Sequence, residues 1–539
     1  MRFKNLYIFS VLLISAGISI GLLSTSSLLA QSDHEEGQRI DFFIDKKMFQ
    51  AGVQPMVASE DAVFHRRIYL DVVGMIPSAK NTEAFIKNKP LDKKSKLIDA
   101  LLNSPSYTDH WTNIWFTFLI GRNPDRSKTN HGKLRAWLLE SVSKNRPYDR
   151  WVSDLLTAKG QNDEHGATNF LIHHDLEPLA IAGSVSKLFL GLPLECAQCH
   201  DHPTEEWTQK DYYGMAAFFS QVIPEEPTRN MRAKFQKMKE ANEITGPMPV
   251  NIIDQERRKF IINGVKGEEI ISPRFIDGRR PKAGDWALRH AFVDLMISPT
   301  SPYFSKNIVN RIWAHFFGRG LVEPLDGLID SNPATHPELL NWLAGSFIAH
   351  KYDLKYLIRT ITNSKAYQRA SLPLNEAENN DLYAHSIIRP LTPDQTVSSI
   401  LQATGLEGIN SRLNRDEMTT IKNRMISQFS FAFNNDEREE MDRFYGTIPQ
   451  ALLMMNGRLT NWGSLAMNGN NLGKILSENT THRERIYWIY MAVLSRPPTP
   501  DEYIYTDNLR PSRRSRKARE VYEDLFWALI NSTEFSVNY

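Results

Sequence analysis

The chain has 539 residues, enough for two or three domains that each bury a core of their own. Hydrophobic residues make up 41% and charged residues 23% of the sequence, which excludes wholesale disorder. Lysine and arginine number 64 against 62 aspartates and glutamates. This near balance excludes the strongly basic class of nucleic-acid-binding proteins, so we expect no nucleic-acid partner.

The first thirty residues have the pattern of a secretory signal peptide. Arg2 and Lys4 precede a nearly continuous apolar stretch over residues 6–23, and Ala30 stands just before polar residues. A positive start, an apolar centre and a small residue before the cleavage point are the parts of such a signal. An uncleaved membrane anchor is the alternative, because the apolar stretch approaches the length that spans a bilayer. We expect an exported protein, periplasmic or extracellular, that meets the membrane at most through this segment.

Residues 34–225 are predicted to form one helical unit. Apolar side chains recur at helical spacing, most clearly in a stripe that we expect to face the core: Trp111, Trp115, Phe118 and Leu119. Asp175 is a candidate N-cap for a later helix, and Pro178 suits its first turn. That helix is predicted to end at Gly191 and Pro193.

Residues 226–284 are rich in proline and charge, which predicts a linker or excursion, with a small hairpin within residues 252–271. Helical spacing returns over residues 285–539, where Thr335 or Ser331 is expected to cap a helix. Few stretches alternate with a period of two. The sequence therefore predicts a mainly α protein of two helical domains joined by a Pro-rich, partly extended linker region.

The only two cysteines of the chain form the motif Cys196-Ala197-Gln198-Cys199-His200. Two thiols three residues apart can bond to the two vinyl groups on one edge of a porphyrin, and the next residue places an imidazole at the iron. Haem c bonded to Cys196 and Cys199, with His200 as an axial iron ligand, is the chemistry that this spacing favours. Such attachment takes place outside the cytoplasm, which agrees with the targeting segment.

Two other chemistries remain open for the motif. Cys196, Cys199, His200 and His202 could hold a structural metal such as zinc, although zinc sites usually draw ligands from two separate segments. The two thiols could also form a plain disulfide or stay free. In the haem interpretation, Asp201 and His202 act around the ligand, orienting the imidazole or binding a haem propionate.

The sequence does not identify the distal iron ligand or any catalytic residue. The candidates for the distal ligand are the methionines after the motif and the histidines before it, namely Met215, Met231, Met238, Met248, His165, His173 and His174. A single methionine is more often core packing than a ligand. The iron could also be five-coordinate.

Several longer strings resemble a family of large exported planctomycete proteins that join a cytochrome-c-like domain of unknown function (DUF1549 type) to a planctomycete-specific second domain (DUF1553 type). The strings that carry the resemblance are Phe64-His65-Arg66-Arg67-Ile68-Tyr69-Leu70-Asp71, Cys196-Ala197-Gln198-Cys199-His200-Asp201-His202-Pro203, Asn307-Ile308-Val309-Asn310-Arg311-Ile312-Trp313, Phe317-Gly318-Arg319-Gly320-Leu321-Val322 and Arg389-Pro390-Leu391-Thr392. The chain departs from the usual pattern at Thr204, where an aromatic residue usually follows the proline.

The resemblance implies haem binding and an association with secreted enzymes of polysaccharide breakdown. We therefore expect electron transfer with a redox partner protein, on a pathway linked to a polysaccharide-related substrate. The alternative is a non-catalytic binding or scaffold protein whose Cys/His cluster is a structural metal or disulfide site. A hydrolase with its site in the second domain is a third hypothesis, and it requires a pocket with convergent carboxylates or a metal.

Overall fold

The computed structural model describes most of the chain, namely residues 36–122, 129–201, 205–241, 248–264, 267–282, 284, 287–372, 380–406, 422, 424–429, 448–510 and 518–539. Its secondary structure is mainly helical with a few short strands, which confirms the mainly α class. No helix within these ranges is long and apolar enough to cross a membrane. The predicted signal segment lies outside the described residues.

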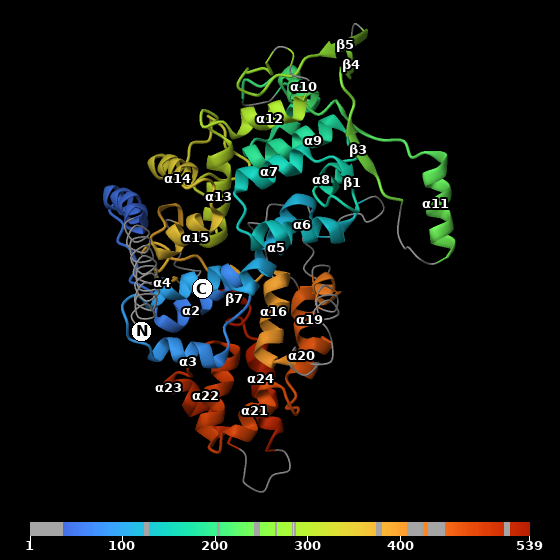
Figure 1. Cartoon of the computed structure of the whole chain (residues 1–539). Coiled ribbons are helices and arrows are strands. Elements are labelled where there is room, and N and C mark those ends of the chain that lie inside the picture. The colour runs from blue at the N-terminus through green and yellow to red at the C-terminus, as the bar shows by residue number, and fades with distance from the viewer. Residues whose placement is uncertain are drawn as a thin grey trace, which may run out of the picture.

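Helices from the first part of the chain build much of the upper and middle parts of the molecule in Figure 1. The first covers residues 36–51. It is followed by α2 (Asp61–Val73), α3 (Ala79–Lys87), α4 (Lys93–Leu102), α5 (Pro105–Ile120), α6 (His131–Ser143), α7 (Tyr148–Thr157), α8 (Thr168–His173), α9 (Pro178–Val185), the π-helix η1 (Ser186–Leu190), the 3₁₀ helix η2 (Leu194–Gln198) and α10 (Gln209–Ala217). Trp111, Trp115 and Leu119 on α5 are buried, as predicted, whereas Phe118 is only partly buried and packs against the core.

The later helices fall into two groups. The first group packs on the upper body and comprises α12 (Leu288–Ile297), α13 (Phe304–Phe317), α14 (Pro337–Ala349) and α15 (Leu354–Asn363), followed by the 3₁₀ turn η3 (Asn380–Leu382). The second forms a lower lobe and comprises α16 (Pro393–Thr404), α19 (Ile448–Asn456), α20 (Arg458–Gly463), α21 (Asn471–Glu478), α22 (His482–Val493), α23 (Pro500–Asn508) and α24 (Glu520–Ile530).

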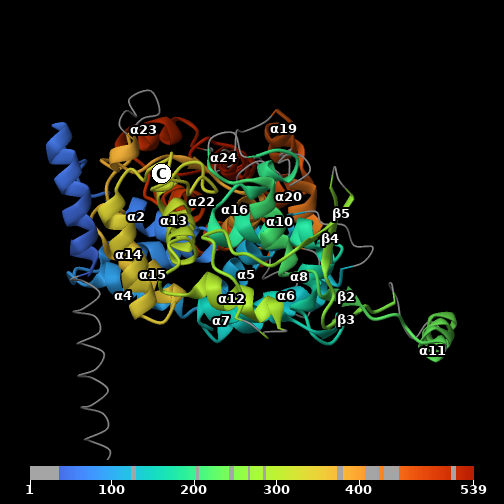
Figure 2. The ribbon, with the colours of Figure 1, turned by 90° about the horizontal axis from the view of Figure 1, so that it is seen from above.

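The strands are short and all pair antiparallel. β1 (Gly160–Gln161), β3 (Asn251–Asp254) and β2 (Val222–Pro224) form one sheet in the order β1-β3-β2. β4 (Phe260–Gly264) and β5 (Gly267–Ile271) form the hairpin predicted within residues 252–271. β6 (Arg389–Pro390) pairs with β7 (Val537–Asn538). Between β2 and β3 the chain forms α11 (Arg229–Glu240), which stands out to one side in Figures 1 and 2.

The hydrophobic interior is divided into two cores. The first runs from Ile40 to Ala384 without interruption at the predicted linker over residues 226–284. The second lies in the lower lobe between Leu391 and Phe535 and also takes in Leu70 of α2 and Ile76. α2 and the turn after it therefore contribute to both cores and join the two parts of the molecule.

Local capping explains where many helices begin, but the cap predicted for α14 is wrong. α22 starts at Thr481, whose hydroxyl accepts from the Glu484 N–H while the Glu484 carboxylate accepts from the Thr481 N–H. α14 does not use Thr335 or Ser331, because it begins at Pro337 with His336 in the cap position and no side-chain cap. The Thr335 hydroxyl instead donates to the Leu321 carbonyl, 3.2 Å away.

Candidate functional site

The segment that leads to the Cys-x-x-Cys-His motif is a helix that changes type before it ends. α9 begins at Pro178, with Glu177 as its cap residue, and continues as the π-helix η1. The predicted cap at Asp175 is wrong: Asp175 and Leu176 both have positive φ angles, 54° and 57°, so the chain turns sharply there. Gly191 ends η1 in the left-handed conformation, as predicted.

The end of η1 is held by side chains from α13. The Asn307 amide donates to the Leu188 carbonyl (2.7 Å), and the Arg311 guanidinium donates to the Lys187 carbonyl (2.9 Å). A Cβ at Gly191 would lie 2.8 Å from the Asn307 amide oxygen, so this close approach requires glycine. The last carbonyls of a helix need donors from elsewhere, and α13 supplies them. The end of η1, which leads into the motif, is therefore held in place by residues more than a hundred positions away in the sequence.

Both cysteines lie on the solvent-facing side of η2. A 3₁₀ helix has three residues per turn, so residues at i and i+3 share a face. Leu194 and Ala197 make one such pair and are fully buried, whereas Cys196 and Cys199 make the other and are exposed. The sulfurs are not joined in a disulfide. In an ideal 3₁₀ turn, a rise of about 2 Å per residue separates the Cα atoms at i and i+3 by about 6 Å, which a disulfide could also bridge.

The C-terminal side of the motif is anchored to α10. The Gln198 carbonyl accepts from the Gln209 side-chain amide (2.7 Å) and from the Tyr213 hydroxyl (3.3 Å). The Asp201 carboxylate accepts from the Gln209 backbone N–H, 3.0 Å away, at the start of α10. Asp201 thus stabilises the N-terminus of α10 and keeps the exposed turn in one position.

The imidazole of His200 is arranged like a metal ligand. Its Nδ1 lies 2.7 Å from the Asp201 carbonyl oxygen, and the ring is exposed. A carbonyl only accepts, so Nδ1 carries the proton and Nε2 keeps its lone pair for a metal. A hydrogen bond from the second ring nitrogen to a backbone carbonyl is the usual support of a metal-bound histidine. The two thiols and this imidazole are a donor set that fits covalent haem.

Other residues that the sequence singled out lie apart from this turn or outside the described ranges. His202 is outside them, and within them no three His, Cys, Asp or Glu side chains gather to hold a metal. Met215 is fully buried in the first core. Met231 and Met238 belong to α11, which both views place far from α10.

The remaining candidates for the distal ligand are Met248 and three histidines. Met248 lies just before β3, and His165 is exposed between β1 and α8. His173 ends α8 and its ring packs edge-on against the ring of His174. Burial, with the neighbouring His173, lowers the pKa of His174 to about 3. The structure therefore does not identify any of these candidates as the distal ligand.

Two family models match the chain on either side of the proline-rich stretch. Residues 39–223 match PSCyt2, described as a protein of unknown function (DUF1549), and residues 288–509 match PSD1, described as a protein of unknown function (DUF1553). The chain contains both domains, in that order. Neither the curated proteins nor the solved structures include a match to it. The Cys-x-x-Cys-His turn belongs to the DUF1549 domain, and α13, which holds its base, belongs to the DUF1553 domain.

The two domains also meet at a buried polar junction around α2, which was not predicted from the sequence. The Asp71 carboxylate accepts from the Tyr367 hydroxyl (2.8 Å), from Arg389 (2.9 and 3.1 Å) and from the Asn538 amide (2.7 Å). Burial and the charge of Asp71 raise the pKa of Tyr367 well above its ordinary value. Asp71 and Arg389 belong to two of the strings that carry the family resemblance, but the sequence alone does not show that they meet.

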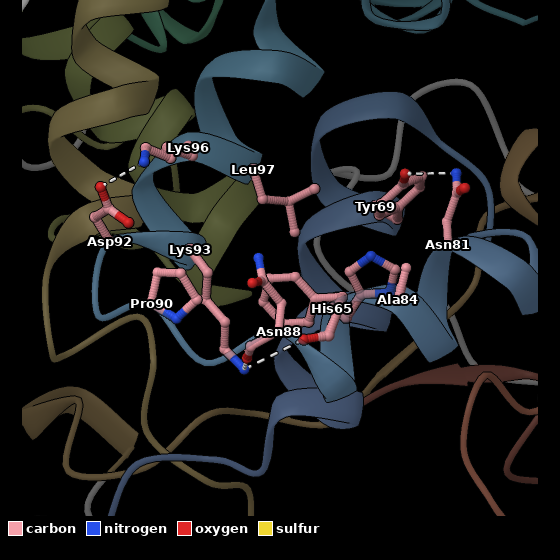
Figure 3. Close-up of a pocket in the computed structure, with 11 residues that line it drawn as sticks. His65, Tyr69, Asn81, Ala84, Asn88, Pro90, Asp92, Lys93, Lys96 and Leu97 are labelled. Carbon is pink, nitrogen blue, oxygen red and sulfur yellow. Dashed lines mark hydrogen bonds and ion pairs between the residues drawn. The ribbon is translucent and has the colours of Figure 1, made fainter.

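A pocket of about 360 Å³ lies in the DUF1549 domain between α2, α3 and α4 (Figure 3). The His65 ring stacks on Phe85 with ring centroids 4.7 Å apart, and the Tyr69 hydroxyl accepts from the Asn81 amide (3.3 Å). The Lys93 ammonium donates to Asp61 (2.6 Å) and to two backbone carbonyls, which uses its three protons. Lys96 pairs with Asp92 at 2.8 Å, so the charged side chains that line the pocket all have ion-pair partners.

Acid is expected to destabilise the protein in part through His65. Burial, with Lys93 nearby, lowers the pKa of this imidazole to about 3, although Asp61 opposes the shift. Because the folded pKa lies below the ordinary value of about 6.5, this stabilisation is complete above pH 6.5 and is lost as the pH falls toward 3. Lowering the pH from 6.5 to about 4 should cost about 3 kcal/mol through this residue.

The measurement is the urea midpoint of unfolding against pH. His65→Phe keeps the stacking on Phe85 but cannot titrate, so its midpoint should fall less steeply with acid than that of the wild type. The matched control is His350→Phe, because His350 is exposed and its ring also stacks on an aromatic neighbour, Tyr356, at 3.7 Å. Equal slopes for the wild type and His65→Phe would contradict the assignment.

Proposed function

We propose that this protein is an exported carrier of haem c, bonded to Cys196 and Cys199 with His200 as an axial iron ligand, and that it transfers electrons to or from a partner protein. Bound haem supplies a one-electron redox centre. The observation that carries the proposal is the arrangement of the motif. The thiols of Cys196 and Cys199 are both exposed, and the imidazole of His200 follows, with its Nδ1 hydrogen-bonded to the Asp201 carbonyl.

The residues around the turn have separate tasks in this proposal. Leu194 and Ala197 hold the inner face of η2 in the core, so that the thiols keep their outward position. The Asp201 carbonyl sets the tautomer of His200, and the Asp201 side chain ties the segment to α10. The exposure of the motif suits electron exchange with another protein, because transfer requires close approach to the redox centre. Export is supported by the signal-like pattern of residues 1–30.

A non-catalytic scaffold protein is the second candidate function. It is supported by the separation of about 6 Å between Cα atoms at i and i+3 of an ideal 3₁₀ turn, which a disulfide can bridge, and by the Cys/His composition of the segment, which suits a structural metal. In that case the disulfide or metal would stabilise the surface of the DUF1549 domain and would have no redox role.

The test is production in a host that exports proteins and attaches haem covalently. We expect a Soret absorption band that stays with the polypeptide after acid–acetone extraction, and an intact mass larger than the polypeptide by one haem. Cys196→Ser/Cys199→Ser should lose both signals completely. Gln198→Ala is the matched control, because this exposed residue lies between the two thiols and contributes only its backbone carbonyl to the contacts of the turn.

Three outcomes separate the candidates. A coloured protein with no free thiol supports haem c. A colourless protein with stoichiometric zinc, or a colourless protein whose thiols appear only after reduction, supports the scaffold function and overturns the haem proposal.

A further inference from the structure

The helix α11 stands apart from the body of the protein. None of its residues is buried, and Figures 1 and 2 both show it beyond the sheet formed by β1, β2 and β3. It has a proper start, because the Thr228 hydroxyl accepts from the Met231 N–H at 3.3 Å. Most helices in proteins are stabilised by packing an apolar face. A helix with no buried residue is therefore expected to gain its contacts from another surface.

One side of α11 is apolar. Met231, Phe235 and Met238 follow one another at i, i+4 and i+7, which places them in a single narrow stripe. Met231 is 39% exposed, and the other two side chains are partly exposed. A row of three large apolar side chains on a projecting helix is a contiguous exposed apolar patch, and such patches mark interaction sites. The stripe is suited to shallow insertion into an apolar layer.

The rest of α11 is strongly basic. It carries five cations against one acid, Glu240; the cations are Arg229, Arg232, Lys234, Lys237 and Lys239. At 100° per residue, Lys234 lies on one side of the apolar stripe, and Arg232 and Lys239 lie on the other. Within the described part of the chain, Arg232 pairs with Glu226 at 2.8 Å, and both side chains are largely exposed. Exposed pairs of this kind are weak and exchange readily for other anions.

We propose that α11 binds to an anionic phospholipid surface, a membrane contact beyond the one expected at the N-terminal segment. The stripe of Met231, Phe235 and Met238 would enter the boundary between headgroups and acyl chains, while the flanking Lys234, Arg232 and Lys239 meet phosphates. A lipid bilayer has an apolar interior for the stripe and anionic headgroups for the flanking cations. α11 lies at the edge of the molecule, so a bilayer can approach it without meeting the rest of the protein (Figure 2). The proposal requires neither haem nor a redox role.

The test uses the chain from Gln31 onward, because residues 6–23 could bind membranes by themselves. We expect sedimentation with vesicles of phosphatidylcholine mixed with phosphatidylglycerol, much weaker sedimentation with phosphatidylcholine alone, and release by salt. Phe235→Ser should weaken binding about tenfold. Lys234→Glu/Lys237→Glu/Lys239→Glu should weaken it about a hundredfold or more.

Two matched controls distinguish binding through α11 from non-specific binding to vesicles. Phe49→Ser removes a ring that is 87% exposed on the helix over residues 36–51, on the opposite side of the molecule in Figure 2, and should leave binding unchanged. Lys80→Glu/Lys87→Glu/Lys96→Glu makes the same change in net charge on exposed lysines of α3 and α4 and should weaken binding far less. Thermal unfolding of each variant confirms that the fold is intact.

Two results would overturn the proposal. One is the absence of binding to anionic vesicles by the unaltered chain, including the case in which α11 instead captures an acidic protein. The other is vesicle binding that survives both sets of α11 substitutions. Because the assay needs no haem, a colourless preparation leaves this test unaffected.

Discussion

Replacing Arg67 with methionine is expected to lower the free energy of unfolding by about 3–5 kcal/mol. The side chain lies on α2 and is 1% exposed. Its guanidinium donates to the buried carbonyls of Tyr367 (2.8 Å) and Arg369 (2.9 Å), and also to a main-chain oxygen of Tyr539 (3.0 Å). Methionine would fill much of the volume but would leave these buried carbonyls without donors. The effect should be large because α2 contributes to both hydrophobic cores.

The measurement is chemical denaturation followed by circular dichroism and by tryptophan fluorescence. A chain with two cores can unfold in two steps, so the midpoints from both probes should be compared before a single free energy is extracted. Arg483→Met is the matched control: this arginine is 67% exposed and pairs with Asp507 at 2.7 Å. Its loss should cost less than about 1 kcal/mol. Similar losses for the two variants would show that the junction does not stabilise the fold as argued.

Replacing Asp71 with alanine is expected to destabilise the protein by a comparable amount, about 3–5 kcal/mol. The carboxylate is 1% exposed and binds Tyr367, Arg389 and Asn538, which lie in three separate segments of the chain. Its removal leaves a largely buried guanidinium with no counter-charge. Removal of one partner from a buried ion pair costs more than the pair itself contributes, because the remaining charge stays desolvated.

Thermal unfolding is the simplest measurement for this variant. Asp154→Ala is the matched control, because Asp154 also pairs with an arginine, Arg146, but its side chain is 52% exposed. The control should shift the midpoint little, since exposed pairs are worth about 1 kcal/mol or less. If Asp71→Ala unfolds at the same temperature as the control, the Asp71 network is not what holds β6 and β7 against α2.

The sequence predicted the helices α5 and α9 of the DUF1549 domain because their signals are local. The apolar stripe of α5 and the stop at Gly191 each depend on neighbours within one or two turns. The same locality explains why Cys196, Cys199 and His200 could be recognised as one site without a structure. Their spacing is contained in five residues, and η2 only decides that both thiols face outward.

Two predicted caps are wrong, one because of a local turn and one because of a contact with a segment farther along the chain. Asp175 was expected to cap α9, but the chain takes two left-handed residues there after α8 ends. Thr335 was expected to cap α14, but its hydroxyl donates to the Leu321 carbonyl instead. A polar side chain before a helix has several acceptors within reach, and the packing of neighbouring segments selects among them.

The sequence by itself determined the helical class, the order of the two domains and the chemistry available at the Cys-x-x-Cys-His turn. Only the tertiary structure decided which distant groups support them: Asn307 and Arg311 hold the base of the turn, and Arg67 reaches a main-chain oxygen 472 residues away. The physical reason is that periodicity and capping are set within a few residues along the chain. The partners of a buried charge depend on which distant segments pack together in the two cores. That packing depends on residues throughout the sequence.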